Sequence, residues 1–290
     1  MVPVSMMVAT TAMLSGIGGA ALFTPIFLII FPLLGPEYEL ASPVAAIGVA
    51  LLTETFGFSS GFVGYYRKRL IDFRSAAPFI AVGVPIAVAG ALVAQVVEPS
   101  LLKGAYAVLM LVLAVIMIRH HAAVEQPVVA ADRAGGAADG RPKRTITGRD
   151  GQIYEFHVPR QGRGAAATGI GAFLTGMVAV GIGEVVMPQL VKRHRVPIPV
   201  AAATSVFVVI VVVASASFTQ IASLVSEGGV GAVPWNLVAY TVPGVIIGGQ
   251  IGPRLHGRIG SRFMERAISG LFAIIGLAML WLVARELAIF

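Results

Sequence analysis

The chain of 290 residues is 57% hydrophobic and only 12% charged, whereas a typical soluble domain is about 45–50% apolar and about 25% charged. A soluble globule of this length could not bury so much apolar surface, which excludes an ordinary soluble enzyme or binding domain and predicts a membrane protein. The formal charge of +7 is carried by basic residues that lie between apolar runs, as membrane topology requires, so nucleic acid is not expected as a partner.

Eight apolar runs follow one another, each near or above the roughly 20 residues that a transmembrane helix needs. They cover residues 3–33, 41–66, 76–97, 100–118, 164–191, 199–225, 233–252 and 263–284. A polar stretch at 119–163 divides the chain into two membrane repeats, residues 1–118 and 164–290, joined by a cytoplasmic linker or insert. Alternating residues around a turn at 148–151 predict a small β-hairpin in this insert, although its composition fits a disordered linker equally well.

The two halves repeat the same motifs in the same order. The motif Gly16-Ile17-Gly18-Gly19, followed by Pro25, recurs as Gly181-Ile182-Gly183-Glu184, followed by Pro188. Two further pairs of segments match, 44–48 with 201–205 and 84–90 with 242–248. The repeated order is more specific than any single match and indicates an internal duplication.

The charges of equivalent loops indicate that the halves are inverted. The loop at 35–39 is acidic and its counterpart at 192–195 is basic. The loop at 67–74 is basic and its counterpart at 227–229 has no basic residue. The loop at 98–99 is roughly neutral and its counterpart at 254–262 is basic. The positive-inside rule therefore places equivalent loops on opposite sides of the membrane. Eight full spans would leave the halves parallel, so the first and fifth runs are expected to be re-entrant hairpins beside six spans. Broken helices that cross fully remain an alternative.

The glycine-rich turns in the first and fifth runs are the best candidates for a binding site. Interrupted helices at matching positions of two repeats point to a transporter site, and a half-helix that begins at such a turn presents free N–H groups to an anion. The substrate-binding candidates are Gly16, Gly18, Gly19, Gly181 and Gly183. The alternative is that these glycines only allow close helix packing.

Two carboxylates, Glu54 and Glu184, lie within apolar runs. An ionised carboxylate is costly at membrane depth, so such residues usually face a cavity and often carry protons. Both are candidates for proton coupling, against a structural hydrogen bond between helices. An ionised Glu184 would repel an anion at the turn, whereas a protonated one would not, which would let an anion and a proton move together.

Hydroxyl side chains follow each turn and could donate hydrogen bonds to an oxyanion; the candidates are Ser59, Ser60, Thr204 and Ser205. The alternative is small polar contacts between helices. The segment 57–61 also fits the G-x-S-x-G pattern of a hydrolase nucleophile, but it lies inside an apolar helix and all five histidines fall in predicted loops. No catalytic residue, metal site or cofactor is expected. Glycines 244, 248 and 252, four residues apart, predict a helix-packing stripe.

These motifs resemble the sulfite exporter TauE/SafE family of bacterial carriers. The resemblance covers nearly all the hydrophobic sequence and rests on 16–19 with Pro25, 45–48 leading into 56–61, 71–72, 181–183, 203–205 and 235–236. It implies transport of small sulfur oxyanions or organosulfur anions. Glu184 departs from the family, which usually continues with glycine, and this puts a strictly symmetric site in doubt. A related group of thiosulfate carriers relies on cysteine, which this chain lacks.

We therefore expect an all-α polytopic membrane protein of two inverted repeats, each a broken or re-entrant hairpin plus three transmembrane helices. Its expected function is secondary transport of a small sulfur-containing anion across the bacterial inner membrane, in the outward direction and coupled to protons. A passive anion channel and an intramembrane serine hydrolase are the alternatives. The lipid bilayer and the anion are the expected partners, and the sequence does not determine whether the chain forms a homo-oligomer.

Overall fold

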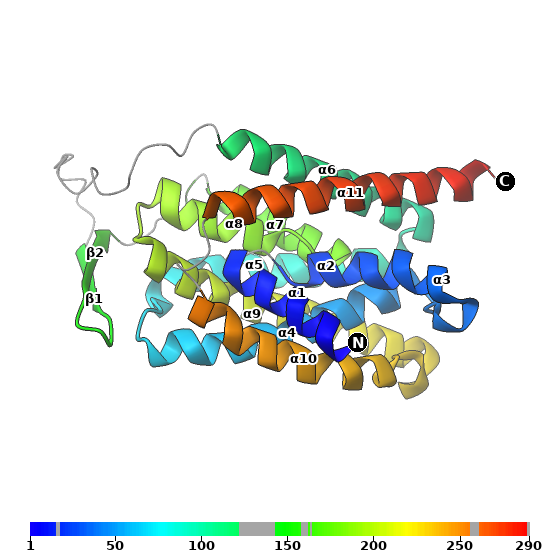
Figure 1. Cartoon of the computed structure of the whole chain (residues 1–290), viewed down its shortest axis with the longest axis horizontal. Helices are drawn as coiled ribbons and strands as arrows, with labels where there is room; N and C mark the ends of the chain where they lie inside the picture. Colours follow the sequence, from blue (N-terminus) through cyan, green and yellow to red (C-terminus); the bar gives the residue numbers. More distant parts are fainter. Residues whose placement is uncertain (16–17, 122–142, 158–161, 163, 256–260, 289–290) are drawn as a thin grey trace.

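A computed structural model describes the chain except for residues 16–17, 122–142, 158–161, 163, 256–260 and 289–290 (Figure 1). The described residues are mostly helical and include one two-stranded sheet. In Figure 1 the long helices run roughly along one axis, the sheet lies beyond one end of the bundle, and the C-terminus lies at the other end. The prediction of an all-α polytopic membrane protein is confirmed.

The first half consists of helices joined by short connections. In chain order they are α1 (Val2–Ser15), α2 (Ala20–Pro25), the π-helical η1 (Ile26–Ile30), α3 (Phe31–Leu34), the 3-10 turn η2 (Pro36–Tyr38), α4 (Pro43–Arg67), α5 (Phe73–Val96) and α6 (Pro99–His121). Proline sits in the first turn of α4, and Ser42 caps this helix by accepting the Ala45 N–H at 3.1 Å.

The second half follows the insert and, like the first, consists of a broken run followed by three long helices. The insert contains β1 (Lys143–Thr147) and β2 (Ile153–His157). The second half contains α7 (Gly164–Val178), α8 (Ile182–Pro188), the π-helical η4 (Gln189–Arg193), α9 (Ile198–Gly228), the 3-10 turn η5 (Val230–Ala232), α10 (Trp235–Leu255) and α11 (Ser261–Ala288). The first and fifth apolar runs are each split into two arms, α1 with α2, and α7 with α8.

Five of the described helices, α4, α5, α6, α9 and α11, are long and apolar enough to cross a membrane. The sixth expected span, at 233–252, corresponds to α10, whose 21 residues include several glycines, two prolines and Gln250. These residues lower its apolar content, and α10 packs against α1 and α4. Its crossing of the membrane stays a prediction.

Neither arm that precedes a break can cross the membrane on its own. The 14 residues of α1 and the 15 of α7 would reach about 21 and 22 Å, against the roughly 30 Å of the hydrocarbon core. Figure 1 shows the chain running toward the sheet end along α1 and back along α2 and α3. The first run therefore reverses direction at its glycine-rich turn.

Packing contacts in one half have counterparts in the other. Helix α1 packs on α10 and α7 on α5, while α2 packs on α4 and α8 on α9. The last helices of the two halves, α6 and α11, lie side by side along one edge of the bundle (Figure 1). The first arm of each broken run thus contacts the opposite half, and the second arm contacts its own half.

The glycine stripe of α10 allows α1 to approach closely. A Cβ atom at Gly244 would meet Ser5, at Gly248 the backbone of Met6, and at Gly252 the side chain of Met13. The packing role predicted for this stripe is confirmed. The equivalent crossing of α5 and α7 uses glycine in the same way.

The strands β1 and β2 pair antiparallel, from Lys143 opposite His157 to Thr147 opposite Ile153. The turn between them contacts the α4–α5 loop, because the Arg149 N–H donates to the Lys68 carbonyl at 3.1 Å. A buried carboxylate makes the second contact, since Arg144 Nε lies 2.9 Å from Oδ1 of Asp72.

Asp72 also joins the two membrane halves. Its N–H donates to Thr204 Oγ1 of α9 at 3.0 Å, and its Oδ2 accepts a hydrogen bond from Ser75 Oγ in the first turn of α5. The Asp72 side chain is wholly buried, whereas that of Arg144 keeps 29% of its surface exposed. One carboxylate therefore connects the insert, α5 and α9.

Candidate functional site

The first break places a backbone N–H group beside a buried carboxylate. Gly18 and Gly19 are both buried, and the Gly19 N–H donates to Glu54 Oε1 at 2.8 Å. Glu54 is 3% exposed and lies near the middle of α4. A side chain from a neighbouring span therefore accepts a hydrogen bond at the start of the half-helix α2, where the first N–H groups have no intrahelical partner.

The second break is closed by residues of its own half. Gly181 has a φ of +141°, which glycine adopts at little cost, and a Cβ there would lie 2.5 Å from the Gly171 carbonyl oxygen. Its N–H donates to Glu184 Oε2 at 3.1 Å, and the Ile182 N–H donates to Thr175 Oγ1 at 2.7 Å. A carboxylate thus accepts from the start of α8 as well.

The two carboxylates converge on Gly18. A Cβ atom built there would lie 3.0 Å from Glu54 Oε1 and 3.8 Å from Glu184 Oε1. The Glu184 Oε1 atom is buried and has no hydrogen-bond partner among the described residues. Two carboxylates that share an apolar site repel each other when both are ionised.

The carboxylates are arranged asymmetrically although the halves repeat. The repeat motifs pair Gly19 with Glu184 and, at a constant offset along α4 and α9, Glu54 with Val211. In one half the acid stands on the span, and in the other it stands on the turn. The second half therefore has an acid at Glu184, where the first half has glycine, and an apolar residue at Val211, where the first half has an acid. Each break thus has one carboxylate.

Two residues at this site were not singled out from the sequence. Tyr106 of α6 is buried, donates its hydroxyl to the Ala21 carbonyl at 2.5 Å, and lies within electrostatic reach of Glu184. Thr175 accepts from the first turn of α8, as described above. A tyrosine or threonine within an apolar run reads as ordinary helix packing, and only the fact that a buried hydroxyl needs a partner could have drawn attention to them.

Among the predicted glycines, Gly16 lies outside the described residues, and Gly183 is buried in the first turn of α8. Ser59 is half-buried in α4. Ser60 Oγ donates to the Ile246 carbonyl of α10 at 2.7 Å. Ser60 lies six residues beyond Glu54, about 9 Å along the helix axis, so its hydroxyl joins helices away from the carboxylates.

The two hydroxyls of α9 also have protein partners. Thr204 accepts the Asp72 N–H, and Ser205 donates to the Ala202 carbonyl at 2.9 Å. The structure therefore brings together Gly18, Gly19, Gly181, Glu54 and Glu184, while substrate contacts by the four predicted hydroxyls stay a prediction.

The G-x-S-x-G segment at 57–61 lies inside α4 rather than on a strand-to-helix elbow. Cβ atoms at Gly57 and Gly61 would contact Val245 and the Gly249 carbonyl, so these glycines serve the packing of α4 on α10. Within the described part of the chain, no group of three or more His, Asp or Glu side chains could hold a metal ion.

Comparisons with known proteins extend over both halves. The family model described as "Sulfite exporter TauE/SafE" matches residues 1–279. Over 282 residues the chain is 21% identical to the "Probable membrane transporter protein YunE" of Bacillus subtilis (strain 168), which covers 97% of this chain and 96% of that protein. No solved structure matches the chain.

Proposed function

The chain belongs to the sulfite exporter TauE/SafE family, and on this premise we propose that it is a secondary transporter of a small sulfur-containing anion, acting outward across the bacterial inner membrane. Membership of that family makes it a multi-pass membrane transporter, and the apolar helices agree with this. The sulfur anion, the outward direction, the inner membrane and the coupling to protons are the parts that we propose.

The observation that carries the proposal is the pair of half-helix starts, each already satisfied by a carboxylate. A carboxylate is itself an oxyanion, and Glu54 accepts the Gly19 N–H that a substrate oxyanion would need. Glu184 does the same at Gly181. Sulfite and sulfonates present oxygen acceptors of similar size. The two acidic side chains therefore compete with the substrate for the same donors.

Competition of this kind couples the movement of the anion to the movement of a proton. When both carboxylates are ionised, they hold the backbone donors and repel an incoming anion. When the pair holds one proton, the neutral carboxyl is the weaker acceptor, and a substrate oxyanion can displace it. The proton then accompanies the anion, and loss of the proton after release returns the carboxylates to the N–H groups.

We further propose that the halves are inverted repeats. The opposite charge bias of equivalent loops supports this arrangement, as does the paired packing of α1 on α10 and α7 on α5. A two-fold axis in the membrane plane would place the two breaks near the bilayer centre, where Glu54 lies at mid-span. Alternating access would then move one half against the other around a fixed site.

The direction follows from the gradients that act on the substrate. A negative cell interior favours anion exit by about 2.3 kcal/mol per charge per 100 mV. A monovalent anion that carries one proton moves without net charge, so the membrane potential no longer drives its exit. Exit then follows the substrate gradient and is opposed by a pH gradient with an alkaline interior.

The test is flux in proteoliposomes that contain the purified protein, with labelled sulfite and a panel of sulfonates, with and without a pH gradient. We expect saturable flux, exchange of labelled for unlabelled substrate, and acceleration by the gradient. The variant Glu184→Gln should abolish the acceleration, whereas Glu227→Gln, at the exposed end of α9, should retain it. Unsaturable flux would indicate a channel, and unchanged pH dependence in Glu184→Gln would exclude its proton role.

A further inference from the structure

The α4–α5 loop and the β1–β2 turn form a cleft rich in arginine at the end of the bundle. Arg67, Arg69 and Arg149 line a cavity of 530 Å³ together with Tyr66, Ile71 and Phe73. We name this cavity the arginine cleft. All three arginines are exposed, and none of them forms an ion pair with another described residue.

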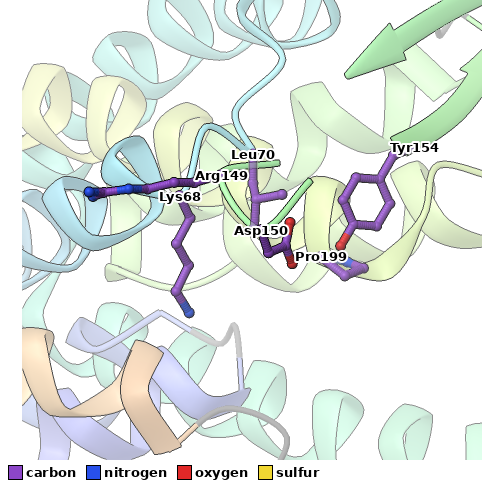
Figure 2. A pocket seen from close by; sticks show the side chains of 6 residues that line it. All are labelled: Lys68, Leu70, Arg149, Asp150, Tyr154 and Pro199. Atoms are coloured by element: carbon purple, nitrogen blue, oxygen red, sulfur yellow. The ribbon is translucent and has the colours of Figure 1, made fainter. Parts of the chain in front are cut away.

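The neighbouring acidic groups do not neutralise the cleft. The Asp72 carboxylate is already paired with Arg144, below the surface. A second cavity, of 480 Å³, adjoins at Arg149, and Figure 2 shows its lining, with the Arg149 side chain pointing away from Asp150. In that cavity partial burial and the Asp150 charge raise the pKa of Tyr154 above its ordinary value, so its phenol stays neutral. The arginine cleft therefore keeps its positive charge.

An aromatic cluster continues from the cleft along the apolar surface of the bundle. The Phe73 and Phe207 rings have centroids 5.0 Å apart, Phe207 and Phe62 lie 5.7 Å apart, and Phe62 stacks on Tyr66 at 5.8 Å. Tyr66 and Phe73 remain 59% and 46% exposed. Exposed aromatic rings at the ends of spans are typical of the level of the lipid headgroups.

The cleft lies where a membrane span ends and the next begins, because α4 ends at Arg67 and α5 begins at Phe73. The loop between them carries the basic bias of a cytoplasmic loop. The cytoplasmic leaflet is enriched in anionic lipids, and basic pockets between helices on this side of the membrane bind their headgroups. The small anion that the carboxylate site would carry needs no neighbouring aromatic surface. A lipid needs both the basic cleft, for its headgroup, and the aromatic surface, for its acyl chains.

We propose that the arginine cleft is a binding site for an anionic phospholipid, whose phosphate contacts Arg69 and Arg149 and whose acyl chains lie over Phe73 and its aromatic neighbours. The docked hairpin supplies one wall of the site, since Arg149 is held there by its N–H bond to Lys68. A bound lipid thereby fixes the insert to the membrane surface. This site is separate from Glu54 and Glu184, and it does not depend on which anion is transported.

The test is native mass spectrometry of the full-length protein, titrated with phosphatidylglycerol or with phosphatidylcholine of the same acyl chains. We expect preferential binding of phosphatidylglycerol, weakened about tenfold or more in the double variant Arg69→Gln/Arg149→Gln, because each arginine near anionic lipid adds roughly a factor of five. The matched control is Arg195→Gln/Arg254→Gln, which removes the same charge from exposed positions outside the cleft and should bind as the unchanged protein does.

Two further arms distinguish a lipid from a free phosphate. Phe73→Ala should weaken the binding of phosphatidylglycerol but not of glycerol 1-phosphate, which has the headgroup phosphate without acyl chains. Equal affinity for the two lipids, or equal loss in both double variants, would overturn the proposal. Glycerol 1-phosphate binding as tightly as the lipid would replace it with a soluble-anion site.

Discussion

Replacing Glu54 with glutamine tests whether the two carboxylates share a proton. The amide keeps an oxygen that can accept the Gly19 N–H, so the half-helix start remains satisfied while the charge is removed. The Oε1 atoms of Glu54 and Glu184 lie within 4 Å of one point, the Cβ position of Gly18. The two oxygen atoms are therefore at most about 7 Å apart, and two unit charges at that separation repel by about 2.4 kcal/mol at an effective dielectric constant of about 20.

This repulsion sets the size of the expected effect. If flux requires one proton on the pair, it falls as the pH rises and the second carboxylate ionises. Without the Glu54 charge, Glu184 loses its proton more readily, so the midpoint of the flux–pH profile should move to lower pH. A change of about 2.4 kcal/mol corresponds to a shift of about 1.8 pH units.

The assay is the initial rate of labelled sulfite flux in proteoliposomes, measured from pH 5 to pH 9 with equal pH on both sides. Glu227→Gln serves as the control and should leave the midpoint in place. A Glu54→Gln profile with an unchanged midpoint, or one that moves to higher pH, would refute the shared proton. The variant should also keep its melting temperature in detergent, which separates a shifted midpoint from loss of the fold.

Two other predictions concern packing. Arg144→Met should cost up to about 3–5 kcal/mol because it strands the buried Asp72 carboxylate, whereas Asp72→Asn should cost only about 1–2 kcal/mol because Arg144 can turn to water. Amide hydrogen exchange in β1 and β2 measures the loss of stability in both variants. An equal loss in the two, or a larger loss in Asp72→Asn, would contradict the buried ion pair. Gly90→Leu should destabilise by about 3 kcal/mol or more because the side chain would enter the Phe173 backbone, while Gly104→Leu, which faces open space, should melt as the unchanged protein does.

Much of the fold could be predicted from the sequence because lipid imposes a simple requirement on the chain. Apolar runs of sufficient length must lie in the membrane, and five of them correspond to helices that can cross it. The glycine-rich turns at 16–19 and 181–184 marked the two breaks, since non-helical backbone at this depth needs glycine and a protected setting. The stripe from Gly244 to Gly252 marked the contact with α1 in the same way.

The partners of the carboxylates could not be predicted. Glu54 and Gly19 are 35 residues apart and stand on different helices, and Asp72 contacts Thr204 across 132 residues. In a soluble protein, hydrophobic periodicity shows which face of a helix is buried. In a membrane protein lipid is as apolar as the protein interior, so the sequence gives little indication of how each helix is rotated about its axis.

The sequence by itself determined that this chain is a membrane protein and at which residues its helices break. It also determined that two acidic residues lie within the apolar runs. Only the tertiary structure decided that each acid accepts a hydrogen bond from one half-helix start, and that the two acids meet at Gly18. The physical reason is that membrane insertion depends on the composition of each segment alone. The site instead depends on the rotation and close approach of α2, α4 and α8, which glycine permits and helix packing fixes.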